Sequence, residues 1–258
     1  MDLRLKGKTA LVTGSYRGTG LIICKALIDE GVDTLVHGLH APEAEEAVHE
    51  LEGGIPVNAD ITTLDGCQTL IKLASHYNVD IIINNYGTAD NNSWKDEDSS
   101  AWFTAFEKNV LSAQRITAGL LPKMLKKKWG RIINLGTTGS TKPSHKNPAY
   151  YSAKGALSAM TVSLAAELKQ TGVTANIVSP GLILTPEVQD ALTNQAIKKN
   201  EDPSWEIIES RIAKDIPIGR IVRREEVASL VTFLCSPIAD AIHGQNIKID
   251  GGALGIVS

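Results

Sequence analysis

The sequence predicts an α/β protein built on one doubly wound, seven-stranded parallel sheet with helices on both faces. Three observations lead to this prediction. Short, nearly continuous apolar runs alternate with longer segments of helical periodicity, a glycine-rich turn follows the first run, and no linker or change of composition divides the 258 residues. Strands that helices cover on both sides are apolar throughout and rich in β-branched residues. We therefore expect a single domain that spans residues 1–258.

The strands are expected where β-branched apolar runs such as "TALVT" and "DIIINN" are bounded by turn residues. Seven runs meet this description, and in chain order they cover residues 9–13, 34–38, 55–60, 80–85, 131–136, 174–179 and 246–250. The helices are expected between them, where apolar residues recur every three or four positions. In chain order the expected helices are 18–30, 41–52, 63–77, 98–128, 150–171 and 223–235.

One segment, residues 183–217, does not follow the alternation of strands and helices. It is polar, helix-prone and bracketed by Pro186 and Pro217. Because it is too long for a plain connection, we expect it to be a substrate lid, with a surface helix pair as the alternative.

The composition excludes several classes of function. The net charge is −3 and no long region is basic, so we expect no nucleic-acid partner. The three cysteines are far apart and have no histidine pair beside them, which argues against disulfides and a structural metal and favours a reducing, cytoplasmic setting. No apolar stretch reaches the roughly 20 residues of a membrane span, and the first residues do not have the pattern of a signal peptide.

The first functional motif is "TGSYRGTG", residues 13–20, which follows the first expected strand and opens the first expected helix. Gly14, Gly18 and Gly20 allow a tight turn and a close approach of the backbone to a pyrophosphate, whose charge then faces the helix N-terminus. The position of this glycine loop within a strand–helix alternation indicates dinucleotide binding.

The end of the second strand bears on the choice between NAD and NADP. NAD enzymes place an acid there for the ribose 2′-hydroxyl, but in "LVHGLH" this position is Gly38. No carboxylate would repel a 2′-phosphate, and Arg17 in the glycine loop could attract one, so NADP(H) is weakly favoured over NAD(H). We expect His37 and His40 to be ordinary surface or strand-end histidines.

Motifs along essentially the whole chain resemble the short-chain dehydrogenase/reductase family, ordinary short type. The glycine loop matches TGxxxGxG, "NNYG" (84–87) matches NNAG with Tyr86 as a departure, and "YYSAK" contains YxxxK. "VNADIT" carries the adenine-binding acid, "EKNVLSA" the catalytic asparagine, and "NIVSPGLILT" (176–185) and "IDGG" match the segments near the chain's end. The resemblance implies a single Rossmann-fold domain and an NAD(P)-dependent oxidoreductase that interconverts a ketone and a secondary alcohol by hydride transfer, without a metal.

The resemblance also implies which residues bind the cofactor. Residue by residue, the matching positions are Gly14, Ser15, Arg17, Gly18, Thr19, Gly20, Gly38, Asp60, Ile61, Asn85, Gly87, Tyr150, Lys154, Pro180, Gly181, Ile183 and Thr185. Thr185 in "TPEV" also has the form of a helix N-cap, and the two roles are compatible.

Two adjacent tyrosines compete for the role of proton donor. Residues three and four apart share a helix face, so Tyr150 and Tyr151 could both approach Lys154. The YxxxK spacing of the family selects Tyr150 as general acid/base and makes Tyr151 a packing residue. The lysine ammonium is expected to lower the pKa of the phenol from its ordinary value of about 10.

The other catalytic positions follow from the same resemblance. The family's serine is replaced by Thr137, which can still donate a hydrogen bond to the substrate oxygen, and Thr138 is the next candidate. Asn109 would hold a water that relays protons to Lys154.

The sequence is compatible with several alternatives. A non-catalytic dinucleotide sensor would typically lack the Tyr or the Lys. Within the enzymes, "KMLKKKWGR" (123–131) lies where 3-oxoacyl-carrier-protein reductases of the family place docking charges, although lysines are also common at helix ends. The enoyl reductase branch spaces its Tyr and Lys more widely. Substrate choice should depend on the loops 89–100, 140–148 and 186–216, and the possible wall residues are Trp94, His145 and Trp205.

We expect the substrate to be a small molecule and the assembly to be a homotetramer. The segment 150–171 carries apolar or small residues on more than one face, and the chain ends with Ile256 and Val257, which have no evident internal partner. Leftover apolar surface usually marks an interface, and closed two-fold symmetry is the common solution.

Overall fold

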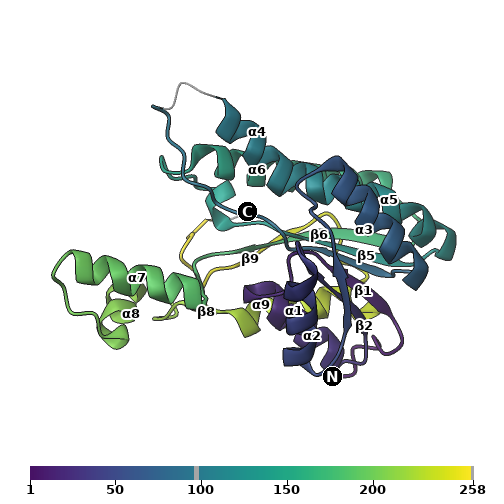
Figure 1. Ribbon diagram of the computed structural model, residues 1–258, viewed down its shortest axis with the longest axis horizontal. Coiled ribbons are helices and arrows are strands. Elements are labelled where there is room, and N and C mark those ends of the chain that lie inside the picture. The colour runs from purple at the N-terminus through teal and green to yellow at the C-terminus, as the bar shows by residue number, and fades with distance from the viewer. Residues whose placement is uncertain (96–98, 257–258) are drawn as a thin grey trace.

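A computed structural model of the chain, which describes residues 1–95 and 99–256, contains the expected seven-stranded sheet (Figure 1). All its strands are parallel and their order is β3-β2-β1-β4-β5-β6-β9. Their bounds are Thr9–Val12 (β1), Asp33–Gly38 (β2), Ile55–Asn58 (β3), Ile81–Asn84 (β4), Gly130–Leu135 (β5), Val173–Pro180 (β6) and Asn246–Ile249 (β9). Every strand predicted from the sequence is confirmed to within two residues at each end.

Helices cover both faces of the sheet, so the predicted doubly wound arrangement is confirmed. One face packs against α1 (Gly18–Asp29), α2 (Ala41–Leu51) and α9 (Arg224–Cys235), and the other against α3 (Leu64–Ala74), α5 (Ser112–Lys127) and α6 (Pro148–Glu167). Each face has its own apolar core because successive strand residues point to opposite sides. Ile82 and Ile83 of β4 accordingly belong to different cores, and both are fully buried.

The prediction of a single helix over residues 98–128 is wrong in one respect, because a π-helical turn interrupts the helix. The chain forms α4 (Ser100–Phe106), a π-helical turn η2 (Glu107–Leu111) and then α5. Asn109 lies inside the π turn, and its Nδ2 donates to the carbonyl oxygen of Ala105 (3.0 Å). Such single π turns occur frequently at functional sites. Residue 98 lies outside the described residues.

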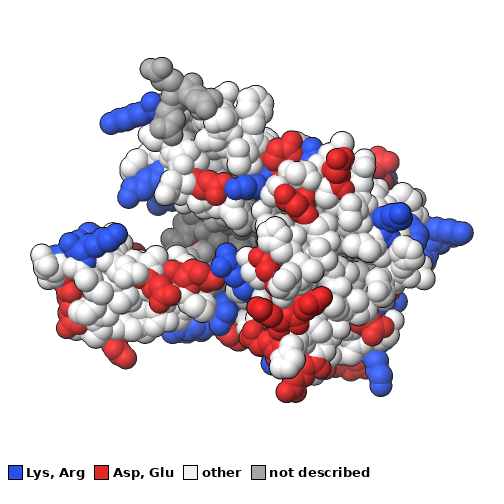
Figure 2. Space-filling model, in the orientation of Figure 1, with Lys and Arg blue, Asp and Glu red and all other residues white. Residues whose placement is uncertain are grey.

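The segment between β6 and α9 forms an arm that projects from the sheet (Figure 1). It consists of β7 (Ile183–Leu184), α7 (Pro186–Lys198), α8 (Trp205–Ala213) and β8 (Val222–Arg223), and β7 pairs in parallel with β8. Thr185 is confirmed as the N-cap of α7, since its side chain accepts from the backbone N–H of Val188 (3.2 Å). Figure 2 shows a hollow in the surface between this arm and the helices α4 and α6.

Acidic and basic side chains are intermixed on the face shown in Figure 2. Cys24, Cys67 and Cys235 are buried free thiols. Over residues 1–95 and 99–256, no helix combines the length and the apolar character that crossing a membrane requires.

Candidate active site

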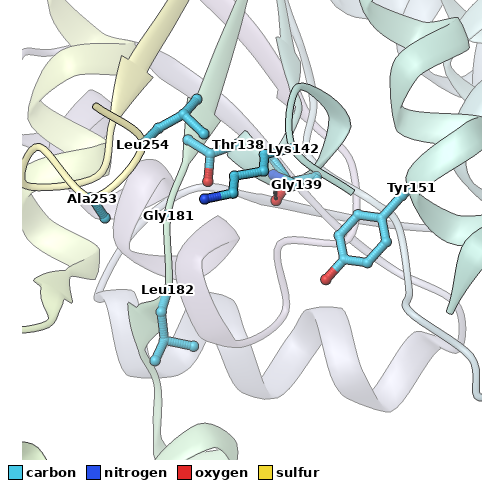
Figure 3. Close-up of a pocket in the computed structure, with 9 residues that line it drawn as sticks. Thr138, Gly139, Lys142, Tyr151, Gly181, Leu182, Ala253 and Leu254 are labelled. Atoms are coloured by element: carbon cyan, nitrogen blue, oxygen red, sulfur yellow. Dashed lines mark hydrogen bonds between the residues drawn. The ribbon is translucent and has the colours of Figure 1, made fainter. Parts of the chain in front are cut away.

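Two cavities, each of about 350 Å³, open near the carboxyl ends of the strands. The loop pocket lies beside the glycine loop and the end of β4. It is lined by Gly14, Tyr16, Arg17, Gly18, Thr19, Gly20, Leu39, Asn85, Tyr86, Gly87, Thr88 and Glu187. The threonine pocket lies beyond the end of β5 (Figure 3), and its lining comprises Thr137, Thr138, Gly139, Lys142, Tyr151, Gly181, Leu182, Ala253 and Leu254. In open parallel sheets, ligands bind at this carboxyl edge.

The glycine loop has the tight geometry that the sequence predicts. Gly14 and Gly18 have positive φ angles of 58° and 62°. A Cβ atom on Gly20 would lie 2.7 Å from the carbonyl oxygen of Gly14, so only glycine fits there. Asn85 fixes the loop, because its Nδ2 donates to the carbonyl oxygens of Thr13 (3.0 Å) and Gly14 (2.9 Å).

The N-terminus of α1 is available to an anion, because no side chain caps it. Uncapped backbone N–H groups and the helix dipole favour a phosphate at this position.

Ser15 and Thr19 have different positions in the loop. Thr19 lines the loop pocket, whereas Ser15 does not. The hydroxyl of Ser15 is buried and donates to the carbonyl oxygen of Val12 (2.7 Å), so its side chain holds the loop together.

His37 is fully buried, so the expectation of an ordinary histidine missed its role. The backbone N–H of Gly14 donates to its Nδ1 (2.9 Å), and its Nε2 lies 3.0 Å from the carbonyl oxygen of Ala59. These two contacts require the neutral ring with hydrogen on Nε2. Burial, the largest influence, lowers the pKa of His37 to about 4. The imidazole therefore joins the glycine loop to the end of β3.

This bond network predicts a pH-dependent stability. The pKa of His37 is about 4 in the folded chain and 6.5 in its ordinary state, so its stabilising contribution is complete above pH 6.5 and is lost as the pH falls through 4. We expect a loss of about 3 kcal/mol from this residue over that interval. Urea unfolding of the unmodified chain and of His37→Asn at pH 7 and pH 4 measures it. The two proteins should differ in pH dependence, and parallel curves would contradict the assignment.

The end of β2 has no space for an acid at Gly38. A Cβ there would lie 2.9 Å from Cβ of Glu43 and 3.0 Å from the carbonyl oxygen of His40. Gly38 lines neither pocket, whereas Leu39 lines the loop pocket. A carboxylate is nevertheless close, because Oε2 of Glu43 accepts from the backbone N–H groups of Leu39 (2.9 Å) and His40 (3.0 Å).

Arg17, the expected partner of a 2′-phosphate, faces the arm. Its Nη1 lies 3.8 Å from Oε1 of Glu187 in the first turn of α7, and both side chains are more than half exposed. The sequence did not suggest this pair, since its members are 170 positions apart. Arg17 is thus shared between the glycine loop and the arm.

Asp60 follows β3 in the turn that leads into α3. Its Oδ1 accepts from the backbone N–H of Thr62 (3.0 Å) and from the Thr62 hydroxyl (2.6 Å), while Ile61 is buried beside it.

Tyr86, the departure from the family motif, packs over Gly14. A Cβ added to Gly14 would lie 3.0 Å from the tyrosine ring. Burial above all, and then the charge of Asp60, raises the pKa of Tyr86 to about 12.

Lys154 and Asn109 converge on Gly87. A Cβ on Gly87 would lie 2.5 Å from Oδ1 of Asn109 and 2.9 Å from Nζ of Lys154, so any other residue there would displace the ends of these two side chains. The lysine is buried, its Nζ donates to the carbonyl oxygen of Leu135 (2.7 Å), and burial lowers its pKa to about 8. Nδ2 of Asn109 donates to Thr88 (3.1 Å), but its Oδ1 has no hydrogen-bond partner among the described residues.

Tyr150 and Tyr151 pack edge to face, with ring centroids 5.3 Å apart. Burial, followed by the neighbouring Tyr151, raises the pKa of Tyr150 to about 12. The expectation that Lys154 lowers this pKa is wrong for this structure, in which burial dominates. Tyr151 lines the threonine pocket and its hydroxyl points into the cavity (Figure 3), so it is more than a packing residue. Its ring lies against Gly139, where an added Cβ would be 2.1 Å from Cε1.

Thr137 begins a short 3₁₀ turn, η3 (Thr138–Ser140), after β5. Its Oγ1 accepts from the backbone N–H of Gly139 (3.2 Å), which leaves its own hydrogen available for donation. Thr138 lines the same pocket, so both threonine candidates remain. Ser140 is not a candidate, since its hydroxyl donates to the carbonyl oxygen of Thr137 (2.7 Å).

The remaining predicted residues follow β6. Pro180 ends that strand, and the backbone N–H of Gly181 donates to the carbonyl oxygen of Ile249 (3.0 Å). Gly181 and Leu182 form part of the threonine pocket, whereas Ile183 and Thr185 lie at the base of the arm. None of Trp94, His145 and Trp205 lines either pocket. Lys142, in the same loop as His145, lines the threonine pocket, as do Leu182, Ala253 and Leu254, and the sequence did not single out any of these residues.

Comparisons with known proteins identify the family of the chain. Residues 14–253 match a family model of short-chain dehydrogenases described as enoyl-(acyl carrier protein) reductase. The D-beta-hydroxybutyrate dehydrogenase of Cupriavidus necator is 35% identical, with 96% of this chain and 98% of that protein covered. A 3-oxoacyl-[acyl-carrier-protein] reductase of Aquifex aeolicus is 30% identical over 98% of this chain and 99% of its own.

A solved structure gives the same result for the fold. L-sorbose reductase from Gluconobacter frateurii, complexed with NADPH and L-sorbose, superposes with a TM-score of 0.93 at 29% identity, and each chain is covered completely. The match over most of the chain, the shared fold and the motifs in their expected places lead to one conclusion. The chain belongs to the short-chain dehydrogenase/reductase family and is an NAD(P)-dependent oxidoreductase.

Proposed function

We propose that the chain interconverts a ketone and a secondary alcohol, with Tyr150 as general acid/base. The observation that carries this proposal is the convergence of Lys154 and Asn109 on Gly87, in the wall of the loop pocket. Tyr150 precedes Lys154 by one helical turn and packs against Tyr151 in the wall of the threonine pocket. The proton donor thus lies beside the threonine pocket, and the glycine loop lines the loop pocket. This arrangement suits the interconversion of a ketone and an alcohol with a bound cofactor.

The residues present fit a nicotinamide dinucleotide. The glycine loop and the uncapped start of α1 would hold its pyrophosphate, and Asp60 and Ile61 its adenine end. The unpartnered Oδ1 of Asn109 is a buried acceptor that suits a hydrogen-bond donor in the completed site. Gly181, Ile183 and Thr185 would contact the nicotinamide end. When bound, the cofactor supplies or accepts a hydride.

The chain's own residues handle the proton. In the oxidative direction the substrate hydroxyl gives its proton to Tyr150 as the carbon gives up a hydride, and in the reductive direction Tyr150 returns the proton to the carbonyl oxygen. Thr137 donates a hydrogen bond to that oxygen. Asn109 orients a water that exchanges protons with Lys154, whose ammonium lies beside it at Gly87.

A turnover assay tests the proposal. The chain would be incubated with NADPH and NADH and a panel of neutral and acidic ketones, and with the oxidised cofactors and the matching alcohols. Absorbance at the reduced nicotinamide band should change with at least one pair. Cofactor binding without turnover of any ketone or alcohol would indicate the sensor alternative.

We propose a carrier protein only as a disfavoured alternative substrate. Two lysines of the run 123–131 have structural partners: Nζ of Lys123 donates to the carbonyl oxygen of Ser75, and Nζ of Lys127 lies 2.7 Å from Oδ1 of Asp80. Asp80 precedes β4, at the sheet edge opposite to both pockets. These charges therefore do not point a docked carrier toward the threonine pocket.

NADP(H) is proposed as the weakly favoured cofactor. Arg17 supports it, and the shared use of Arg17 by Glu187 keeps the preference small. Arg17→Ala should raise the dissociation constant of NADPH several-fold more than that of NADH. Glu187→Gln is the matched control: it should tighten NADPH, because the arginine is released. Fluorescence titrations measure both, and tighter binding of NADH than of NADPH by the unmodified chain would refute the preference.

A homotetramer is proposed for the assembly. An apolar groove between α5 and α6 is lined by Gln114, Thr117, Ala118, Leu121, Met160 and Leu164. Val162 on α6 and Ile256 near the chain end are 53% and 47% exposed, while Val257 lies outside the described residues. Light scattering at micromolar concentration should give about four times the 27.6 kDa of one chain, and a mass of one chain would disprove assembly.

The buried free thiols support a cytoplasmic setting.

A further inference from the structure

We propose that the threonine pocket selects substrates with a carboxylate close to the reacting carbonyl or hydroxyl group, and that Lys142 binds this carboxylate. The proposal rests on the ketone–alcohol chemistry proposed above and specifies the class of substrate: short oxo acids and the corresponding hydroxy acids.

The position of Lys142 is fixed relative to Thr137 by one hydrogen-bonded turn. The backbone N–H of Ser140 donates to the carbonyl oxygen of Thr137 (3.1 Å), and those of Thr141 and Lys142 donate to Thr138 (3.0 and 3.2 Å). The turn therefore holds the backbone of Lys142 close to Thr137, whose hydroxyl would bind the reacting oxygen, and the exposed side chain of Lys142 extends from this turn. In Figure 3 the side chain of Lys142 projects into the cavity.

The charge of the pocket is unbalanced in favour of an anion. Its lining contains one cation, no carboxylate and the hydroxyls of Thr137, Thr138 and Tyr151. No carboxylate of the described residues forms an ion pair with Lys142, whereas Arg17 in the loop pocket is paired with Glu187. Ammonium and hydroxyl donors are the groups that bind a carboxylate by charge-assisted hydrogen bonds.

The apolar part of the lining limits the size and polarity of the rest of the substrate. Leu182, Ala253 and Leu254 are apolar, and Gly181 adds no side chain. A cavity of about 350 Å³ is at the small end for ligand sites, which suits a molecule of a few carbon atoms. The pocket thus combines groups that bind charge with apolar side chains that suit a short aliphatic chain.

The test compares two probes of nearly the same shape, acetoacetate and its neutral amide, acetoacetamide, by calorimetry with saturating oxidised cofactor. Both are ketones, so no hydride can be transferred and binding alone is measured. We expect the unmodified chain to bind acetoacetate at least about 10-fold more tightly, the low end for a hydrogen bond to a charged group. Lys142→Met should remove this difference by weakening acetoacetate only, and Lys142→Arg should keep most of it.

Lys146→Met is the matched control, since Lys146 belongs to the same loop but does not line the pocket. It should leave both dissociation constants unchanged. Equal affinity of the unmodified chain for the two probes, binding of neither, or equal losses in the Met variants at 142 and 146 would overturn the proposal. Failure of the proposed function is separate, because it is measured as absence of turnover and not as absence of this binding difference.

Discussion

Replacement of Tyr150 by phenylalanine is expected to lower kcat/KM by at least about 10²-fold, the low end for loss of a general acid or base. The ring and its edge-to-face contact with Tyr151 would remain, so the wall of the threonine pocket should keep its shape. Only the group that carries the proton is removed. Cofactor affinity should change little, because the glycine loop and the start of α1 are untouched. Steady-state kinetics and fluorescence titration measure the two quantities.

Tyr151→Phe is the control for this prediction. Tyr151 also loses a hydroxyl, but this hydroxyl points into the substrate cavity, so KM should rise modestly while kcat is retained. A larger loss of kcat at position 151 than at position 150 would show that the spacing to Lys154 has been assigned to the wrong ring. Unaltered turnover in the Tyr150 variant would reject a phenolic proton donor altogether.

The second large effect is expected at Thr137, where valine should lower kcat/KM by about 10²-fold, the order found when one hydrogen-bond donor to a developing oxyanion is removed. Valine has nearly the same shape, so the loss reports the missing hydroxyl. The Oγ1 of Thr137 already accepts from Gly139, and its hydrogen is therefore the part available to a substrate oxygen.

Two further variants separate the threonine's contributions. Thr137→Ser keeps the hydroxyl and should stay active, with a wider substrate range because a methyl group is removed from the pocket wall. Thr138→Val alters the other candidate and should affect KM more than kcat. If the valine at 137 is fully active and the valine at 138 is not, the roles of the two threonines are reversed.

The fold could be predicted from the sequence because its signals are local. Runs such as Ile81–Asn84 are apolar and β-branched over the length of one strand. Strands of this kind are typical of a parallel sheet that helices cover on both faces, so the runs also predict the two helical layers. The glycine loop and the N-cap at Thr185 were also predictable, since each depends on residues only a few positions apart.

The parts that escaped prediction depend on contacts between distant positions. His37 looks like an ordinary polar residue until Gly14 and Ala59 are brought to its two ring nitrogens. Arg17 looks free until the arm brings Glu187 beside it. The elevated pKa of Tyr150 has the same origin, because burial is a property of the folded chain and not of the YxxxK spacing.

The pairing of β7 with β8 has a consequence for how the protein can vary. Ile183 and Val222 are register partners, so the arm leaves the body and returns to it at nearly the same place. A segment whose ends are already joined can be lengthened, shortened or exchanged at little entropic cost to the rest of the chain. The arm can therefore change in length or sequence while the sheet, the glycine loop and the proton-handling groups keep their positions.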